Sequence, residues 1–173
     1  GGVFGRGDLT AAADAIHAVQ PQLSLLDDFH TGAFQFLQMH LHKHAGHHTA
    51  MVQAAETALA AFERADWTAG VVALRRELAR WSMISGESQE ATQRFQAIAA
   101  GGNRDRLLVT NELIVAYYLA AENSYWLDQL AQARAYQQLC LALADQLQDQ
   151  ELIYLAQCLG ELVDPNGTCA DVD

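Results

Sequence analysis

The sequence predicts an all-α protein built from pairs of antiparallel helices. Its 173 residues are 51% hydrophobic and 18% charged, which is enough apolar material for a substantial core. Ala, Leu and Gln dominate the long stretches, and these residues favour helices, while strand-like alternation is absent. Turn-forming residues recur about every 40 residues, a spacing typical of stacked helical repeats. They are Gly7, Gly46, Gly86, Asn123 and Gly167.

The apolar pattern between these turns predicts eight helices. They cover about residues 8–20, 26–44, 50–65, 67–84, 89–99, 105–122, 127–147 and 150–163. Thr49, Asp66 and Ser88 are expected to cap three of them, because short polar side chains accept hydrogen bonds from the free N–H groups of a first turn. Residues 100–103 and 123–126 are expected to interrupt the helices.

Small and large residues inside these pairs follow the order found in tetratricopeptide-like repeats. The clearest set is Leu78-Ala79, Gly86, Ala91, Phe95 and Ile98. Partial sets are Leu159-Gly160, Val163 and Gly167; Val115-Ala116, Leu119 and Asn123; and Gly7, Ala12, Ile16 and Val19. A small residue facing a large one lets two helices approach closely, which gives the order a physical basis. The chain therefore resembles that family over nearly its whole length.

The resemblance implies a superhelix of stacked helix hairpins that binds partners and is not an enzyme. It implies a single repeat domain over 1–173 with units at 7–20, 26–65, 67–99, 105–148 and 150–167, taken from a longer protein. Residues 139–151 look like the longer-helix variant found in bacterial signalling proteins. That variant is joined to a diguanylate cyclase or a DNA-binding output domain, so we expect a regulatory, partner-binding module.

The net charge and the absence of catalytic motifs limit the classes of partner and activity that we expect. The net charge of −11 disfavours nucleic acid and anionic membranes, leaving a protein, a peptide or a small ligand. No catalytic motif is present in the sequence, so we expect no enzyme activity. Cys140, Cys158 and Cys169 have no metal-binding spacing, and the first two are expected among apolar residues. Such thiols suit the reducing cytoplasm.

The inner face of such an array is lined by the first helix of each pair. Transferring the family's groove positions by register selects Phe36, His40, Arg76, Arg80, Tyr117, Tyr154, Gln157 and Glu161. Arg76 and Arg80 are one helical turn apart and could both face one ligand carboxylate, although a solvated face paired with Glu77 or Glu87 explains them equally well. Tyr117 could equally belong to the core.

Two further hypotheses stay open. His40, His44, His47 and His48 could hold Zn²⁺ or Ni²⁺, although Gly46 is expected to break the helix between them. A polar helix end, where histidine complements the helix dipole, is the alternative reading of this cluster. Tyr125 and Trp126, or the terminal helices, could instead form a homodimer contact.

Overall fold

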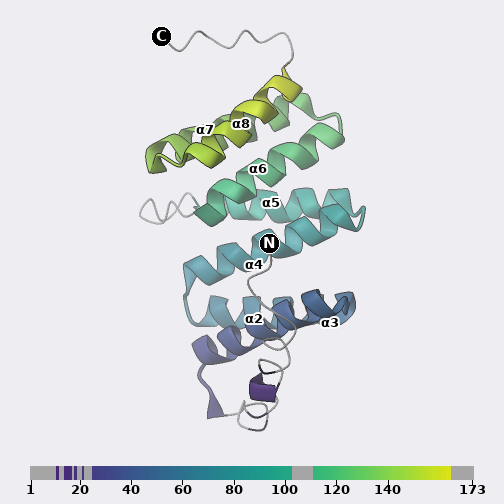
Figure 1. The fold of residues 1–173 in the computed structure, drawn as a ribbon, viewed down its shortest axis with the longest axis vertical. Coiled ribbons are helices and arrows are strands. Elements are labelled where there is room, and N and C mark those ends of the chain that lie inside the picture. The colour runs from purple at the N-terminus through teal and green to yellow at the C-terminus, as the bar shows by residue number, and fades with distance from the viewer. Residues whose placement is uncertain are drawn as a thin grey trace. The chain divides into compact units, whose positions relative to one another are not determined.

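The computed structural model describes residues 25–102 and 111–164, together with residues 11, 14–16, 18 and 21. Every regular element of these residues is helical, as the composition predicts (Figure 1). The helices are α2 (Asp28–Ala45), α3 (His48–Arg64), α4 (Thr68–Ile84), α5 (Ser88–Gly102), α6 (Asn111–Trp126), α7 (Leu130–Leu147) and α8 (Gln150–Val163). The chain forms two compact units, residues 1–74 and 75–173, whose boundary falls within α4.

The first unit is organised around the buried ring of Phe62 on α3. Helix α2 packs against α3, and Gly32 of α2 leaves no room for a side chain between its backbone and that ring. Phe62 also contacts Trp67 at the α3–α4 turn, with ring centroids 4.4 Å apart, and Phe29 at 6.2 Å. Gly70 of α4 leaves room for the rings of Trp67 and Phe62, because a Cβ at this position would clash with both. The core of this unit is therefore an aromatic cluster closed by two glycines.

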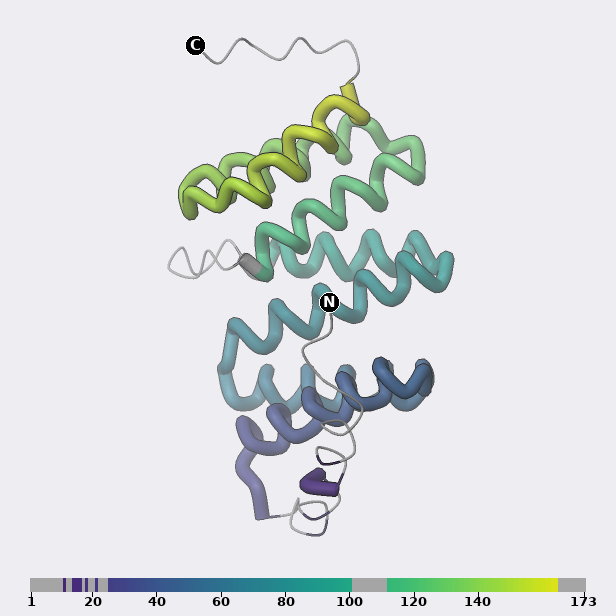
Figure 2. The backbone as a smooth tube through the Cα atoms, in the orientation of Figure 1, coloured from purple at the N-terminus to yellow at the C-terminus, as the bar shows by residue number. Residues whose placement is uncertain are grey.

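The second unit packs its helices through small residues and buried amides. Helix α6 contacts α5, α7 and α8, and α7 contacts α8, as the tube trace in Figure 2 lets the reader follow. Ala120 and Ala121 on α6, and Ala133, Cys140 and Ala144 on α7, are almost completely buried. Side chains of this size allow two helices to approach to about 8–10 Å.

Two buried amides also cross between helices of the second unit. Asn123 of α6 donates to Thr92 Oγ1 of α5 at 3.0 Å, and Gln137 of α7 donates to the Ala156 carbonyl oxygen of α8 at 2.9 Å. Because an unpaired amide is costly in a core, these bonds favour one register of the helices.

Five helix connections share one backbone geometry. A residue in the left-handed conformation ends α2, α3, α4, α6 and α7, and the next helix begins two residues later. These residues are Gly46, Asp66, Gly86, Asp128 and Gln148. At each, the following residue donates its N–H to the carbonyl five residues back, and the left-handed residue donates three residues back. This is the Schellman motif, which satisfies the last carbonyl groups of a helix.

The expected turn at Asn123 is wrong. Helix α6 continues through Asn123 to Trp126, and the left-handed residue is Asp128, with φ of 58°. Asn123 stays helical because its amide is satisfied by Thr92 and Ser88 across the helix interface. Asp128 takes the turn because a short polar side chain tolerates the left-handed conformation better than most residues do. The spacing that suggested Asn123 therefore had no structural basis at this position.

Three expected helix caps are also corrected. His47, not Thr49, is the N-cap of α3, and it makes no side-chain capping bond. Asp66 lies at the left-handed position two residues before α4, and Ser88 is already the first residue of α5. Side-chain caps are instead made by Asp27 and Asp149, which accept from the backbone N–H three residues later.

The helix predicted over 89–99 continues to Gly102, so the first three residues of the expected loop at 100–103 are helical. Gly7, residues 103–110 and Gly167 lie outside the described residues, as does Cys169. Of the predicted helix over 8–20, the described positions 11, 14–16 and 18 are helical.

Candidate functional site

One of the two predicted groove arginines, Arg76, is already engaged in ion pairs. Arg76 of α4 is only 17% exposed at its side chain. Its Nε donates to Glu112 Oε2 of α6, and its Nη1 lies 3.0 Å from Glu77 Oε1. Two carboxylates of the same unit therefore neutralise this guanidinium. Arg80, one turn further along α4, is half-buried.

Tyr117 lies in the core and not on an open surface. It is 9% exposed, its ring centroid is 6.1 Å from that of Tyr136 on α7, and burial raises the pKa of its phenol. The physical reason is the misplaced turn. Tyr117 lies six residues before the expected turn at Asn123, whereas the residue six positions before the observed turn at Asp128 is Glu122.

Counting from the observed turns gives a consistent pair of positions on three helices. The residues ten and six positions before the left-handed residue are Phe36 and His40 on α2, Arg76 and Arg80 on α4, and Tyr118 and Glu122 on α6. All six are half-buried. Tyr118 and Glu122 were not predicted from the sequence. Placing the turn at Asp128 instead of Asn123 selects both residues by the same register.

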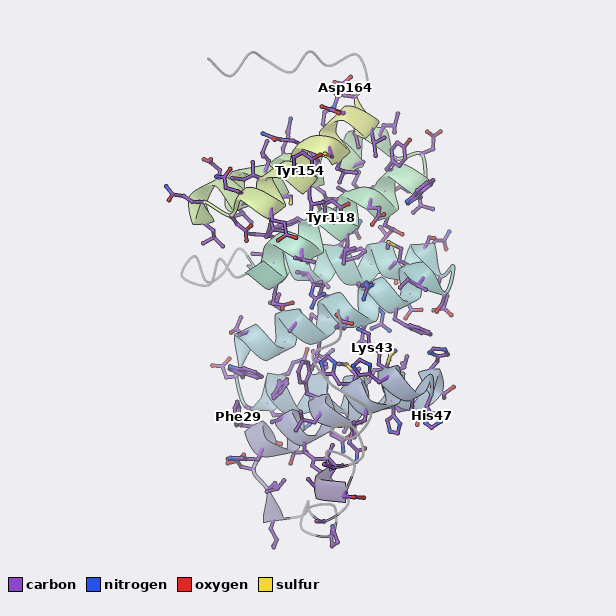
Figure 3. The ribbon with its side chains drawn as sticks, in the orientation of Figure 1. Phe29, Lys43, His47, Tyr118, Tyr154 and Asp164 are labelled. Atoms are coloured by element: carbon purple, nitrogen blue, oxygen red, sulfur yellow. The ribbon has the colours of Figure 1, made fainter. Side chains whose placement is uncertain are left out.

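Helix α6 contacts α8 directly, and Tyr118 of α6 interacts with Cys158 of α8 and with Glu122 one turn along its own helix. Burial raises the pKa of Tyr118, and the negative field of Glu122 adds to the rise, followed by the thiols of Cys140 and Cys158. Its phenol therefore stays neutral near neutral pH. Figure 3 labels Tyr118 on α6 and Tyr154 on the neighbouring α8.

The predicted residues of α8 are open to solvent. The side chain of Tyr154 is 66% exposed, and Gln157 and Glu161 are exposed as well. A hydrogen bond with the Cys158 thiol is the main cause that raises the pKa of Tyr154, and Glu161 contributes weakly to the same rise. Tyr154 therefore presents a neutral ring beside a carboxylate.

We use the term α6–α8 surface for five residues that these interactions connect. They are Tyr118, Glu122, Tyr154, Cys158 and Glu161. Helix α8 is held in place by Gln137, whose amide reaches the Ala156 carbonyl past the bare backbone of Gly160. A Cβ at Gly160 would lie 2.9 Å from Gln137 Nε2, so the glycine leaves space for this contact. The surface thus rests on ordered helices.

Phe36 and His40 belong to the first unit. Their rings meet edge to face with centroids 4.6 Å apart on α2, and both side chains are half-buried. They form a local aromatic pair on the face of α2 that the register predicts. The predicted groove residues therefore fall in two units, each of which has its own set.

The histidine cluster does not form a metal-binding group in the part of the chain that the structure describes. No three His, Cys, Asp or Glu side chains lie close enough there to hold an ion. Gly46 turns the chain at φ of 74°, so His47 and His48 leave the face that carries His40 and His44. The rings of His42 and His47 instead lie 6.0 Å apart across the turn.

Trp126 is the most exposed tryptophan of the described residues, at 74%. It ends α6, and its ring meets that of Tyr125 with centroids 5.5 Å apart. Trp126 therefore presents a large apolar ring to solvent.

Comparison with known proteins gives no family assignment: no protein-family model matches the chain, and no curated protein matches it either. None of the described helices is both long enough and apolar enough to cross a bilayer.

Proposed function

We propose that this chain is a tetratricopeptide-like helical-repeat module that binds a segment of a partner protein or peptide. In this proposal the module acts in the cytoplasm and has no catalytic activity of its own. It regulates a signalling protein to which it is attached, such as a diguanylate cyclase or a DNA-binding regulator. The similarity of residues 139–151 to the long-helix variant is the reason for the regulatory role.

One observation carries the repeat assignment. In the helix that follows Gly46, Gly86 or Asp128, the residues five, nine and twelve positions after the turn are all buried. They are Met51, Ala55 and Ala58 on α3; Ala91, Phe95 and Ile98 on α5; and Ala133, Gln137 and Cys140 on α7. Three helices with the same buried offsets support repetition of one packing unit.

The half-buried positions before the turns supply candidate binding residues, and each unit carries its own set. Side chains at these positions differ in chemistry between helices: an aromatic and a histidine on α2, two arginines on α4, and a tyrosine and a glutamate on α6. A repeated backbone that carries varied side chains at equivalent positions suits recognition of an extended segment.

A displayed library of random peptides, panned against the chain, tests this function. We expect enrichment of sequences whose binding falls when Gln157 on α8 is replaced by alanine. The matched control is Gln138→Ala, which removes another exposed glutamine from α7. A library with no enrichment over an unrelated helical protein would overturn the proposed function.

Homodimerisation is a second candidate, and the exposure of Trp126 is the observation that favours it. Sedimentation of the wild type and of Trp126→Ala across a concentration range tests it. A wild-type dimer that dissociates in the variant supports this candidate, and a monomer at all concentrations excludes it.

A further inference from the structure

Charge is strongly one-sided over residues 111–164, which are part of the second unit. Residues 111–164 contain eight acidic residues and one basic residue, Arg134. Arg134 is itself paired, since its Nη2 lies 2.7 Å from Asp164 Oδ2. Arg76 of α4, which forms an ion pair with Glu112 of α6, is already neutralised by two carboxylates. No cation of residues 111–164 is therefore left to balance the acidic groups of α6 and α8.

The α6–α8 surface combines this charge with neutral aromatic rings. Tyr154 is mostly exposed and Tyr118 is half-buried, and both interact with the thiol of Cys158. Glu122 lies one turn from Tyr118 on α6, and Glu161 interacts with Tyr154 on α8. The face of a tyrosine ring attracts a cation, and a guanidinium can stack on it while donating two bonds to a carboxylate. Rings and carboxylates on one surface thus offer both kinds of contact to the same side chain.

We propose that the partner segment is basic and that an arginine of this segment docks on the α6–α8 surface, stacking on Tyr154 and pairing with Glu122 or Glu161. This inference rests on the proposed function and specifies its ligand. The complementarity of a cation to an acidic, aromatic surface is its argument. The opposite expectation from the sequence was a ligand carboxylate bound by Arg76 and Arg80. Arg76 is already paired with Glu77 and Glu112, which argues against that ligand.

The test uses fluorescein-labelled twelve-residue Gly/Ser peptides that carry three spaced arginines, with binding measured by anisotropy. Two matched probes replace arginine by citrulline, which keeps the shape without the charge, or by glutamate. The full chain is compared with Tyr154→Leu and Glu161→Gln. Asp145→Asn is the control, because it removes one exposed carboxylate from α7, outside the α6–α8 surface.

We expect the arginine peptide to bind about tenfold more tightly than the citrulline peptide, with weaker binding at high salt. Tyr154→Leu should weaken binding about fivefold and Glu161→Gln about threefold, since one cation–π or charge contact is worth that much. Asp145→Asn should leave the dissociation constant unchanged. All variants should keep the far-ultraviolet circular dichroism of the wild type, because Tyr154 and Glu161 are exposed.

Two outcomes would overturn this inference alone. If Asp145→Asn weakened peptide binding as much as Glu161→Gln does, the peptide would be attracted by the net charge of the protein and not by a defined site. Preference for the citrulline or glutamate peptide would mean the wrong ligand chemistry, and the library would still return binders. An empty library would instead overturn the proposed function itself, so the two failures are distinguishable.

Discussion

The turn after α3 and the turn after α6 have the same backbone geometry, but their surroundings differ. Phe62 and Ser124 occupy the same position, four residues before Asp66 and Asp128, and both are about 1% exposed. In the first unit the position holds a ring that contacts Trp67 and the backbones of Gly32 and Gly70. In the second unit it holds only the small hydroxyl side chain of a serine.

The difference shows that the turn and the core are set by separate residues. The hydrogen bonds of the turn come from the backbone, so they form with Gly, Asp or Gln at the left-handed position. The packing depends on side-chain volume, and a large ring in one helix is matched by glycines opposite it. Where only small residues are available, buried amides supply the specificity that shape supplies elsewhere.

Removal of the ring at the centre of the first unit should have the largest effect. Phe62→Ala is expected to lower the free energy of unfolding by about 3–5 kcal/mol, because the cavity is bounded by glycines and cannot collapse easily. Ser124→Ala should cost about 1 kcal/mol or less. Urea unfolding, with hydrogen exchange to locate the change, measures both. Similar losses in the two variants would contradict the comparison.

The next largest difference between the two units is expected in the stability cost of replacing a buried glycine by alanine. A Cβ at Gly70 would clash with Trp67 and lie 2.7 Å from Phe62 Cδ2, so Gly70→Ala should cost about 1–3 kcal/mol. The Cβ of Gly160→Ala would lie 2.9 Å from Gln137 Nε2, so the end of this flexible side chain must shift slightly while it keeps its bond to the Ala156 carbonyl. Since alanine also favours the helix by about 1 kcal/mol, that change should be close to neutral. Thermal melts measure both variants, and a larger loss of melting temperature in Gly160→Ala than in Gly70→Ala would contradict this prediction.

The shared turn predicts changes of opposite sign in the two units. Gly46→Ala, at φ of 74° with no neighbouring atoms, should cost about 1 kcal/mol from backbone strain alone. Gln148→Gly, at φ of 54°, should gain up to about 1 kcal/mol by relieving the same strain. Denaturant midpoints of the two variants provide the measurement. A loss in Gln148→Gly would mean that its side chain stabilises the turn.

The smallest effect on stability is expected from lowering the pH through the pKa of Asp27, which caps α2. Asp27 accepts from the His30 N–H at 2.8 Å, and this bond is the main cause that lowers the pKa of Asp27 below its ordinary value of 3.8. A lowered pKa stabilises the fold above that value, and the contribution is lost as the pH falls through the folded-state pKa. Asp27→Asn should therefore flatten the stability profile of α2 below about pH 4. An unchanged profile, followed by hydrogen exchange, would show that the cap has no pH-dependent role.

Some of the site was within reach of sequence reasoning. The exposed positions of α8 follow from helical periodicity, because every turn of an amphipathic helix returns to the same face. Tyr118 and Glu122 were missed since their register depends on where α6 ends. An aspartate turn gives no sequence signal as strong as glycine does. The ion pairs of Arg76 could not be foreseen either, because Glu112 belongs to another helix.

The amino-acid sequence by itself determined that the protein is helical and where most helices lie, because helix propensity and apolar spacing act over neighbouring residues. It also determined the acidic balance, which depends on composition alone. Only the tertiary structure decided that Asn123 remains helical, that Tyr117 is buried while Tyr118 is half-buried, and that Arg76 is already paired. Each of these depends on a contact between residues distant in the chain, and local preferences carry no information about such contacts.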